Sequence, residues 1–278
     1  MDGIEIKLLM SFMTDSGRKV SLFVTDPRED VTETEIKQVM DLIIEKNIFA
    51  PNGEDIVSAK EAKIVQTETT EFDFEILKTR LREQAFLNAG IHIQISDERD
   101  PDHIICENFC YEGGISSFVE YLNKKKAVEL VHPDIIHFST VADDDQATAE
   151  VAMQYNDSYN ELILSFANNI HTTDGGTHEE GFKRSLTRVM NDYARKYNLL
   201  KDSDKNLTGD DVREGLTVVI SIKVKDAQFE GQTKAKLGNT EISGLVSNMM
   251  NDKLSTYLEE NPATARAIFD KALAASRA

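Results

Sequence analysis

Hydrophobic positions in the first seventy residues recur with two different periods, and the period of two predicts three strands. An apolar-rich run at 4–14 and an alternating run at 19–25 predict two strands around the turn Asp15-Ser16-Gly17. A third alternating run, at 62–70, predicts another strand.

A helix is predicted between the second and third of these strands. Thr32 and Glu35 have the spacing of a capping box, in which each residue satisfies a backbone donor of the other at a helix start. Five apolar residues then follow at helical spacing: Ile36, Val39, Met40, Ile43 and Ile44. The first part of the chain, residues 1–66, is therefore predicted to be a small ββαβ domain.

The second part, residues 67–278, mixes strands and helices. Helices are predicted from 73 onward and at 113–125, 177–199, 239–259 and 263–277, and strands at 91–96, 103–111, 134–141, 147–155, 161–166 and 216–224. Such mixing predicts an α+β fold with a sheet covered mainly on one face. No linker rich in glycine and serine separates the two parts.

Charge and hydropathy argue against several classes of protein to which this chain could belong. The formal net charge is −18, and acidic residues outnumber basic ones in both parts, which argues against a protein that coats nucleic acid without specificity. No apolar run reaches the roughly 20 residues that span a bilayer. Acidic residues near Met1 are atypical of a signal peptide. We therefore expect a cytoplasmic protein with no membrane partner.

The two cysteines, Cys106 and Cys110, predict neither a disulfide nor a metal site. On one face of an extended strand they would lie about 13 Å apart, which is too far for a disulfide. With His103 they match no common zinc spacing, so we expect reduced thiols and no metal.

The polar segment 229–238 is the first candidate for chemistry. It lies between the strand predicted at 216–224 and the helix that starts near Asn239, so it displays Gln232 and Lys234 on a loop. A lysine ammonium carries three donors and suits a phosphate, although a single exposed lysine is more often simply solvated.

Three further motifs precede that loop. They read Tyr-Glu-Gly-Gly-Ile at 111–115, Asp-Gly-Gly-Thr-His-Glu-Glu-Gly-Phe at 174–182 and Thr-Gly-Asp-Asp-Val-Arg-Glu-Gly-Leu at 208–216. In this order and at these distances, the four motifs resemble the transducer domain of the B subunit of bacterial DNA gyrase or topoisomerase IV. The resemblance covers about 67–278 and does not separate the two parents.

The resemblance implies a fold, a ligand and residue roles. The fold would be that of the second domain of ribosomal protein S5, with a left-handed βαβ crossover. Lys234, with Gln232 and Thr233 beside it, would reach into a neighbouring ATP site and contact the terminal phosphate. The cofactor would be ATP with Mg in the parent protein. We expect this chain alone to bind none and to lack intrinsic ATPase activity and DNA cleavage, because the parts that hold those sites have no counterpart here.

Basic residues on the helix predicted at 177–199 have two interpretations. Lys183, Arg184, Arg188 and Arg195 form either a solvated face, paired with residues such as Glu180 and Asp192, or the lining of a cavity that passes duplex DNA. The resemblance supports the second.

The other polar motifs are interpreted as structural. Asp174-Gly175-Gly176-Thr177 is a tight turn that feeds a helix capped by Thr177, since the neighbouring carboxylates would repel a phosphate. His178 is expected to pack rather than to act as a base, because no nucleophile or orienting acid is evident.

The motif at 208–216 also has a structural interpretation. Thr208 or Asp210 is expected to cap a short helix, and Arg213 to form an internal ion pair.

Residues 1–66 resemble a family of short bacterial proteins of unknown function. The matching segments are Asp-Ser-Gly-Arg-Lys, Val-Thr-Asp-Pro-Arg-Glu-Asp and Ile-Phe-Ala-Pro-Asn-Gly-Glu-Asp-Ile-Val. In the B subunit of a gyrase, a larger nucleotide-binding domain would stand here. The join is compatible with a natural recombinant, an engineered fusion or an artificial sequence.

The sequence thus favours a transducer that couples ATP binding and hydrolysis to DNA strand passage. Its partners would be a gyrase-type nucleotide-binding domain, the A subunit and duplex DNA, and a dimer is compatible with the sequence. The alternative is a non-enzymatic chimeric scaffold or interaction module. A related mismatch-repair or chaperone ATPase domain fits the four motifs less well.

Overall fold

The computed structural model describes residues 3–28, 30–69, 72–143 and 146–277. The chain divides into two compact units, Met1–Asp73 and Phe74–Ala278, which are described separately. Backbone pairing of Thr67 with Glu5 joins the end of the last strand of the first unit to its first strand. The structural division therefore lies a few residues to the C-terminal side of the 66/67 boundary expected from the sequence.

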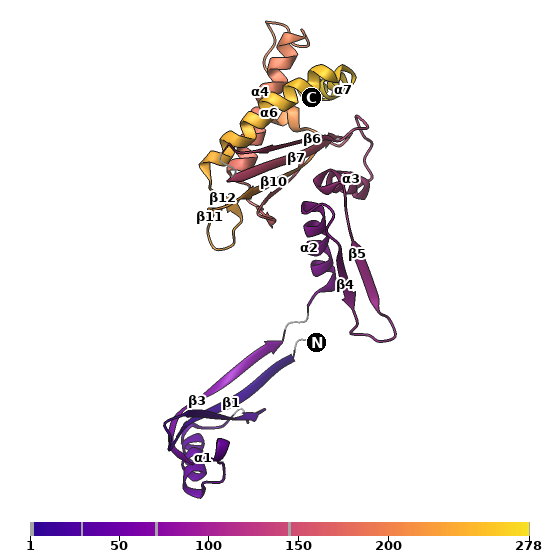
Figure 1. Ribbon diagram of the computed structural model, residues 1–278. Coiled ribbons are helices and arrows are strands. Elements are labelled where there is room, and N and C mark those ends of the chain that lie inside the picture. The colour runs from indigo at the N-terminus through magenta and orange to yellow at the C-terminus, as the bar shows by residue number, and fades with distance from the viewer. Residues whose placement is uncertain (1–2, 29, 70–71, 144–145, 278) are drawn as a thin grey trace. The chain divides into compact units, whose positions relative to one another are not determined.

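The first unit is an antiparallel sheet with one helix, in the ββαβ order that was predicted. Its strands β1 (Gly3–Thr14), β2 (Lys19–Thr25) and β3 (Ile56–Thr69) lie in the order β2-β1-β3. Between β2 and β3 come α1 (Glu33–Lys46) and the short 3-10 helix η1 (Pro51–Gly53) (Figure 1). The third strand begins earlier than the predicted residue 62, and the predicted last residue, Thr70, lies outside the described residues.

Local signals account for α1. The Thr32 side chain accepts from the Glu35 amide, and the Glu35 carboxylate accepts from the Thr32 amide, which confirms the capping box. Met40 and Ile43 pack on the buried side chains of β1. Val39, predicted to share this stripe, is 48% exposed, because it lies at the margin of the face that meets the sheet.

The second unit is built on a five-stranded sheet with the order β6-β7-β10-β8-β9. Its strands are β6 (Ile136–Val141), β7 (Ala147–Tyr155), β8 (Leu162–Ala167), β9 (Ile170–His171) and β10 (Leu216–Val224). The central strand β10 runs antiparallel to β7 and parallel to β8. The parallel pair encloses the helices α4 (Thr177–Lys196) and α5 (Gly209–Arg213) in its crossover.

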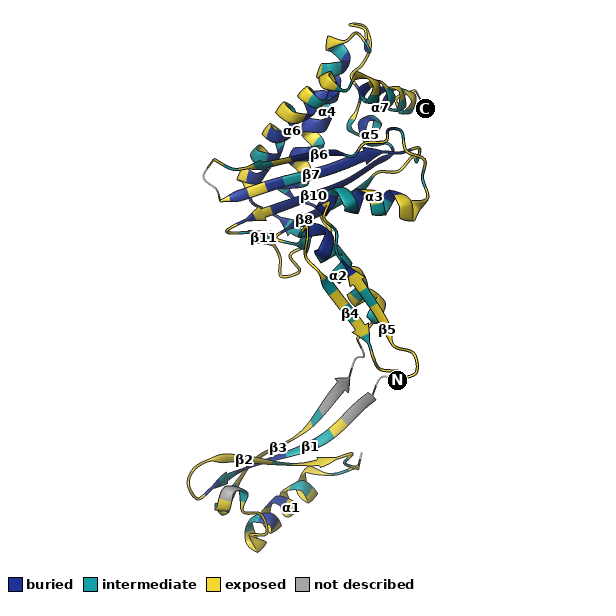
Figure 2. Cartoon of the chain, turned by 45° about the vertical axis from the view of Figure 1, so that its right-hand side comes forward, coloured by how far each residue is buried: buried dark blue, intermediate teal, exposed yellow. Residues whose placement is uncertain are grey.

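Both faces of this sheet carry helices. Two long helices, α4 and α6 (Thr240–Glu260), cover one face together with α7 (Pro262–Ala275). On the other face lie α2 (Phe74–Leu87) and α3 (Gly114–Lys126) (Figure 2). Their aromatic and aliphatic side chains meet Ala152, Phe166 and Val219.

The expectation of a sheet covered mainly on one face is therefore wrong. The physical reason is visible in β10, where eight of nine residues are buried, since apolar side chains on both faces need cover.

Two small hairpins complete the unit. β4 (Ile93–Asp97) pairs with β5 (Ile105–Phe109), and β11 (Phe229–Glu230) pairs with β12 (Lys236–Leu237). Among the described residues, no helix has the length and apolar character needed to cross a membrane.

Candidate functional site

The segment 229–238 is a short hairpin with an exposed tip. Phe229 pairs with Leu237 and Glu230 with Lys236, so that the turn spans 231–235. Gln232, Thr233 and Lys234 are all exposed at this tip. The structure thus displays the predicted residues on a loop, and two short strands, rather than the long flanking elements alone, hold it.

The base of this hairpin is fastened to the turn at 174–176. The Leu237 amide donates to the Gly175 carbonyl (3.1 Å), and the Asp174 amide donates to the Ala235 carbonyl (2.9 Å). Gly176 has φ +139°, and a Cβ there would lie 2.4 Å from the Leu237 carbonyl oxygen. Only glycine fits so close to a backbone, so the two motifs that were considered separately in the sequence form one structural unit.

That contact also changes how α4 begins. Gly176 occupies the N-cap position and makes no side-chain cap, so the predicted N-cap role of Thr177 is wrong. The Thr177 hydroxyl oxygen is buried and has no hydrogen-bond partner within the described residues. Gly176, which approaches β12 closely, is the N-cap, and Thr177 is therefore the first residue of α4.

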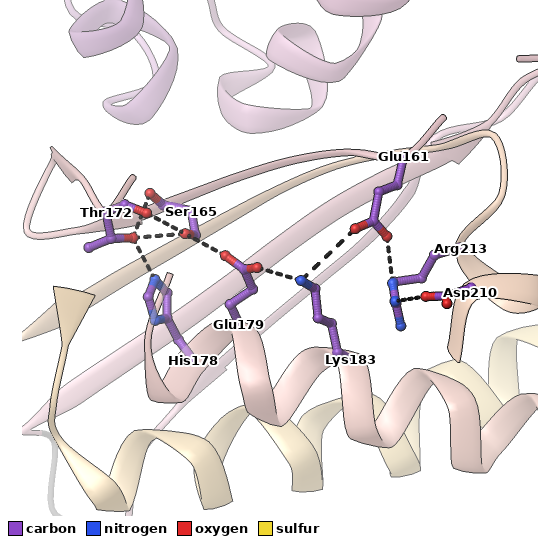
Figure 3. A network of polar contacts seen from close by, with 8 residues as sticks. All are labelled: Glu161, Ser165, Thr172, His178, Glu179, Lys183, Asp210 and Arg213. Atoms are coloured by element: carbon purple, nitrogen blue, oxygen red, sulfur yellow. Dashed lines mark hydrogen bonds and ion pairs between the residues drawn. The ribbon is translucent and has the colours of Figure 1, made fainter. Parts of the chain in front are cut away.

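A buried polar network lies between the sheet and the start of α4 (Figure 3). His178 Nε2 lies 3.0 Å from Thr172 Oγ1, which donates to the Ser165 carbonyl (2.8 Å). The Ser165 hydroxyl donates to Glu179 Oε2 (3.1 Å). Hydroxyls of β8 and of the loop after β9 therefore connect the sheet to the first turn of α4.

His178 is buried and neutral. Burial lowers its pKa to about 4, so it carries no charge near pH 7. Its ring contacts the Thr172 hydroxyl rather than a nucleophile and an orienting acid, as expected for a packing histidine.

The polar network continues as a row of alternating charges. Lys183 Nζ lies 2.7 Å from Glu179 and 4.0 Å from Glu161. Arg213 pairs with Glu161 and, at 2.7 Å, with Asp210, which confirms its predicted internal ion pair. Figure 3 shows this row running from α4 through the residue before β8 to α5.

Thr208 caps α5, as predicted. Its side chain accepts from the Asp211 amide, and the Asp211 carboxylate accepts from the Thr208 amide. The acidic residues of this motif therefore serve a capping box and an ion pair.

The four basic residues of α4 that the sequence singled out as candidates for DNA contact fall into three groups. Lys183 pairs with Glu179 and Glu161, not with Glu180 or Asp192. Arg195 donates to the carbonyls of Lys201 and Asp204, and to Asn206 Oδ1.

Arg184 and Arg188 lie one turn apart and are exposed, with no ion pair within the described part of the chain. They remain available to meet an external anion, whereas Arg195 holds the loop after α4 together.

The two cysteines are free thiols. Cys106 accepts a hydrogen bond from Gln94, and Cys110 lies 3.3 Å from His92 Nε2. Over the ranges that the structure describes, no group of three or more His, Cys, Asp or Glu side chains is arranged to hold a metal ion.

Several residues of the site were missed in the sequence. Ser165, Thr172 and Glu161 belong to no motif, and only the folded chain brings them to α4. Asn239 is buried and accepts from the Gln228 amide (2.7 Å), which closes the hairpin base from the α6 side. An asparagine at a predicted helix start was an available signal, although it suggested a cap that the side chain does not make.

Two protein-family models match this chain, and together they cover most of its residues. The family model described as DNA gyrase B matches residues 114–278, which is more than half of the chain. The chain belongs to the DNA gyrase B family. A second model, described as a protein of unknown function (DUF2922), matches residues 5–73. Both resemblances that the sequence motifs carried are confirmed.

Curated relatives of this gyrase B family member are much longer than this chain. The B subunit of DNA gyrase from Clostridium acetobutylicum is 56% identical over 211 residues, which cover 76% of this chain and 32% of that protein. Its counterpart from Halalkalibacterium halodurans is 53% identical over 230 residues, covering 83% and 34%. The chain therefore spans about a third of the length of these relatives.

A solved structure supports the same family assignment. The 43K ATPase domain of Thermus thermophilus gyrase B, in complex with an aminocoumarin, is similar with a TM-score of 0.65 and 28% identity. The similarity covers 97% of this chain and 68% of that one. The mixed α/β fold of the gyrase B family thus agrees with the fold class predicted from the sequence.

Proposed function

We propose that the second unit is the transducer part of a type IIA DNA topoisomerase of the gyrase B kind. In this role it couples ATP binding and hydrolysis, in a nucleotide-binding domain supplied elsewhere, to the passage of duplex DNA. Its fold would be that of the second domain of ribosomal protein S5, with a left-handed crossover between β8 and β10.

The hairpin tip carries this proposal. Lys234 and Gln232 are exposed on a five-residue turn whose base is fixed by backbone hydrogen bonds to Asp174 and Gly175, in the turn that precedes α4. A cation on a fixed support stabilises the charge that develops on a transferring phosphoryl group without first having to reorganise. Lys234 would meet the terminal phosphate, with Gln232 and Thr233 beside it, and Mg would accompany the ATP.

Because the hairpin is bonded to the turn before α4, a contact between Lys234 and a phosphate could affect the position of that helix. Loss of the phosphate would release the tip, and the backbone bonds at 174–176 would pass the change to α4. Two states of the tip, distinguished by the ligand, are what such coupling requires.

The DNA-facing part of the proposal rests on Arg184 and Arg188. Both are exposed, and neither forms an ion pair with any residue that the structure describes, unlike Lys183. Phosphate contacts require only charge and position, so this pair could line a passage for duplex DNA in an assembly with the A subunit.

The test is ATP hydrolysis by a separately purified gyrase nucleotide-binding domain, measured with and without this chain. We expect stimulation that falls on the order of 10²-fold in the Lys234→Ala variant. Lys223→Ala is the control, because Lys223 is an exposed lysine of the same unit that stands on β10, outside the hairpin. Equal stimulation by the Lys234→Ala variant and the unaltered chain would refute the proposed role.

A second candidate function is a non-enzymatic chimera or interaction module. The observation that favours it is the match of residues 5–73 to a family of unknown function, upstream of the gyrase B match. In that case neither lysine substitution would alter hydrolysis in the mixture.

A further inference from the structure

The ammonium group of Lys234 has no carboxylate partner among the residues that the structure describes. The acidic residue of the hairpin is Glu230, and it pairs with Lys236 directly across the ladder, at 3.2 Å. The arrangement of the two strands thus occupies the carboxylate that could otherwise have neutralised Lys234.

The Phe229 ring, rather than a carboxylate, is the partner of the Lys234 ammonium group. Lys234 Nζ lies 6.0 Å from the centroid of the Phe229 ring, within the range of a cation–π contact. The ring is held in position, because Phe229 pairs with the fully buried Leu237 and packs against the core of the second unit. Lys234 therefore folds back from the tip of the hairpin onto a fixed surface at its base.

The backbone at Lys234 fits the same arrangement. Its φ of +54° is left-handed, a conformation that is unfavourable for a lysine unless its surroundings compensate. The contact between the Lys234 ammonium and the Phe229 ring is one favourable interaction that accompanies this conformation.

We propose that Phe229 is the resting dock of Lys234 and thereby positions the phosphate-sensing group. This inference rests on the proposed function of the hairpin. In the absence of a phosphate the ammonium lies against the ring, which is a weak contact at an exposed site. A charge-assisted hydrogen bond to a phosphate is stronger, so a terminal phosphate draws the lysine away. An ion pair with Glu230 would compete more strongly with the phosphate than the ring does.

The first test uses the full chain without any nucleotide. Protons held over an aromatic ring resonate upfield, so nuclear magnetic resonance of a ¹³C-lysine sample reports the dock directly. We expect the Lys234 side-chain signals to move to the positions of a solvated lysine in Phe229→Leu and to stay in place in Phe229→Tyr. Unchanged Lys234 signals in the leucine variant would overturn the inference, whatever the role of Lys234 in hydrolysis.

The second test adds the nucleotide-binding domain and titrates ATP. Because the phosphate must displace the ring, Phe229→Leu should lower the ATP concentration for half-maximal stimulation about two- to fivefold, while Phe229→Tyr should leave it unchanged. An unchanged or raised value in the leucine variant contradicts the resting dock. Loss of the proposed function itself would show separately, as stimulation that does not depend on Lys234.

Discussion

Substitution of Gly176 by alanine tests whether the turn at 174–176 packs as closely against Leu237 of the hairpin as the structure indicates. A Cβ at this position would lie 2.4 Å from the Leu237 carbonyl oxygen and 2.6 Å from its nitrogen, both of which are backbone atoms that cannot rotate away. The residue also has φ +139° and ψ −167°, a region that is almost exclusive to glycine.

The expected loss of stability follows from these two effects. A side chain forced into such a conformation costs about 1–3 kcal/mol. Overpacking against fixed neighbours costs about 1–3 kcal/mol more. Together they amount to about 2–6 kcal/mol, a large part of the roughly 5–15 kcal/mol that stabilises a typical domain.

Urea unfolding followed by far-ultraviolet circular dichroism is the suitable assay. The chain contains no tryptophan, and the helix signal comes mostly from the second unit, which contains α2–α7. Gly244→Ala is the matched control, because Gly244 is exposed in α6 and nothing lies within 4 Å of its added Cβ. It should gain about 0.5–1 kcal/mol from helix propensity.

A free energy of unfolding for Gly176→Ala within about 0.5 kcal/mol of the unaltered chain would refute this reasoning. It would mean that the turn moves away from β12 at little cost, and that the hairpin is not fastened to α4. Hydrogen exchange at the Leu237 amide, which donates to Gly175, would locate the loosened contact.

Three further predictions concern other parts of the second unit. Burial lowers the pKa of His178 from 6.5 to about 4. The stability that depends on a neutral His178 ring is therefore complete above pH 6.5 and is lost, by about 3 kcal/mol, as the pH falls to 4. In the His178→Asn variant, the free energy of unfolding should change less with pH over that range. Tyr155→Phe removes a buried hydroxyl that donates to a backbone carbonyl at 2.8 Å, and should cost about 1–2 kcal/mol in urea unfolding. Joint replacement of Arg184 and Arg188 by alanine should weaken duplex DNA binding by the assembled enzyme and reduce the slope of log affinity against log salt by about 2, whereas Arg195→Ala should lower stability and leave that slope unchanged.

Local signals predicted the elements of this chain well. The capping boxes at Thr32 and Thr208 depend only on residues three apart, and both are present in the structure. The strands predicted at 147–155 and 216–224 correspond to β7 and β10 residue for residue. These features succeed because each depends on neighbours in the sequence.

The predictions that failed depend on contacts between distant segments. Thr177 has the residue type of an N-cap, but Gly176, which lies close to Leu237, occupies that position. Lys183 could reach several acids along α4, and it pairs with Glu179, one turn away, and also with the distant Glu161, which precedes β8. Side-chain type restricts such pairings without selecting one.

Sequence alone determined the family of each part, the order of the longer helices and strands, and the exposed Gln232-Thr233-Lys234 tip, because these rest on local periodicity and on motifs in a fixed order. Tertiary structure alone decided that helices cover both faces of the sheet. It also decided that the motifs at 174–177 and 229–238 form one unit, and that Lys234 rests on Phe229 while Glu230 pairs with Lys236. The physical reason is that these contacts join segments some sixty residues apart or depend on strand register, and neither the approach of two backbones nor the choice among several oppositely charged partners is encoded in a short window of residues.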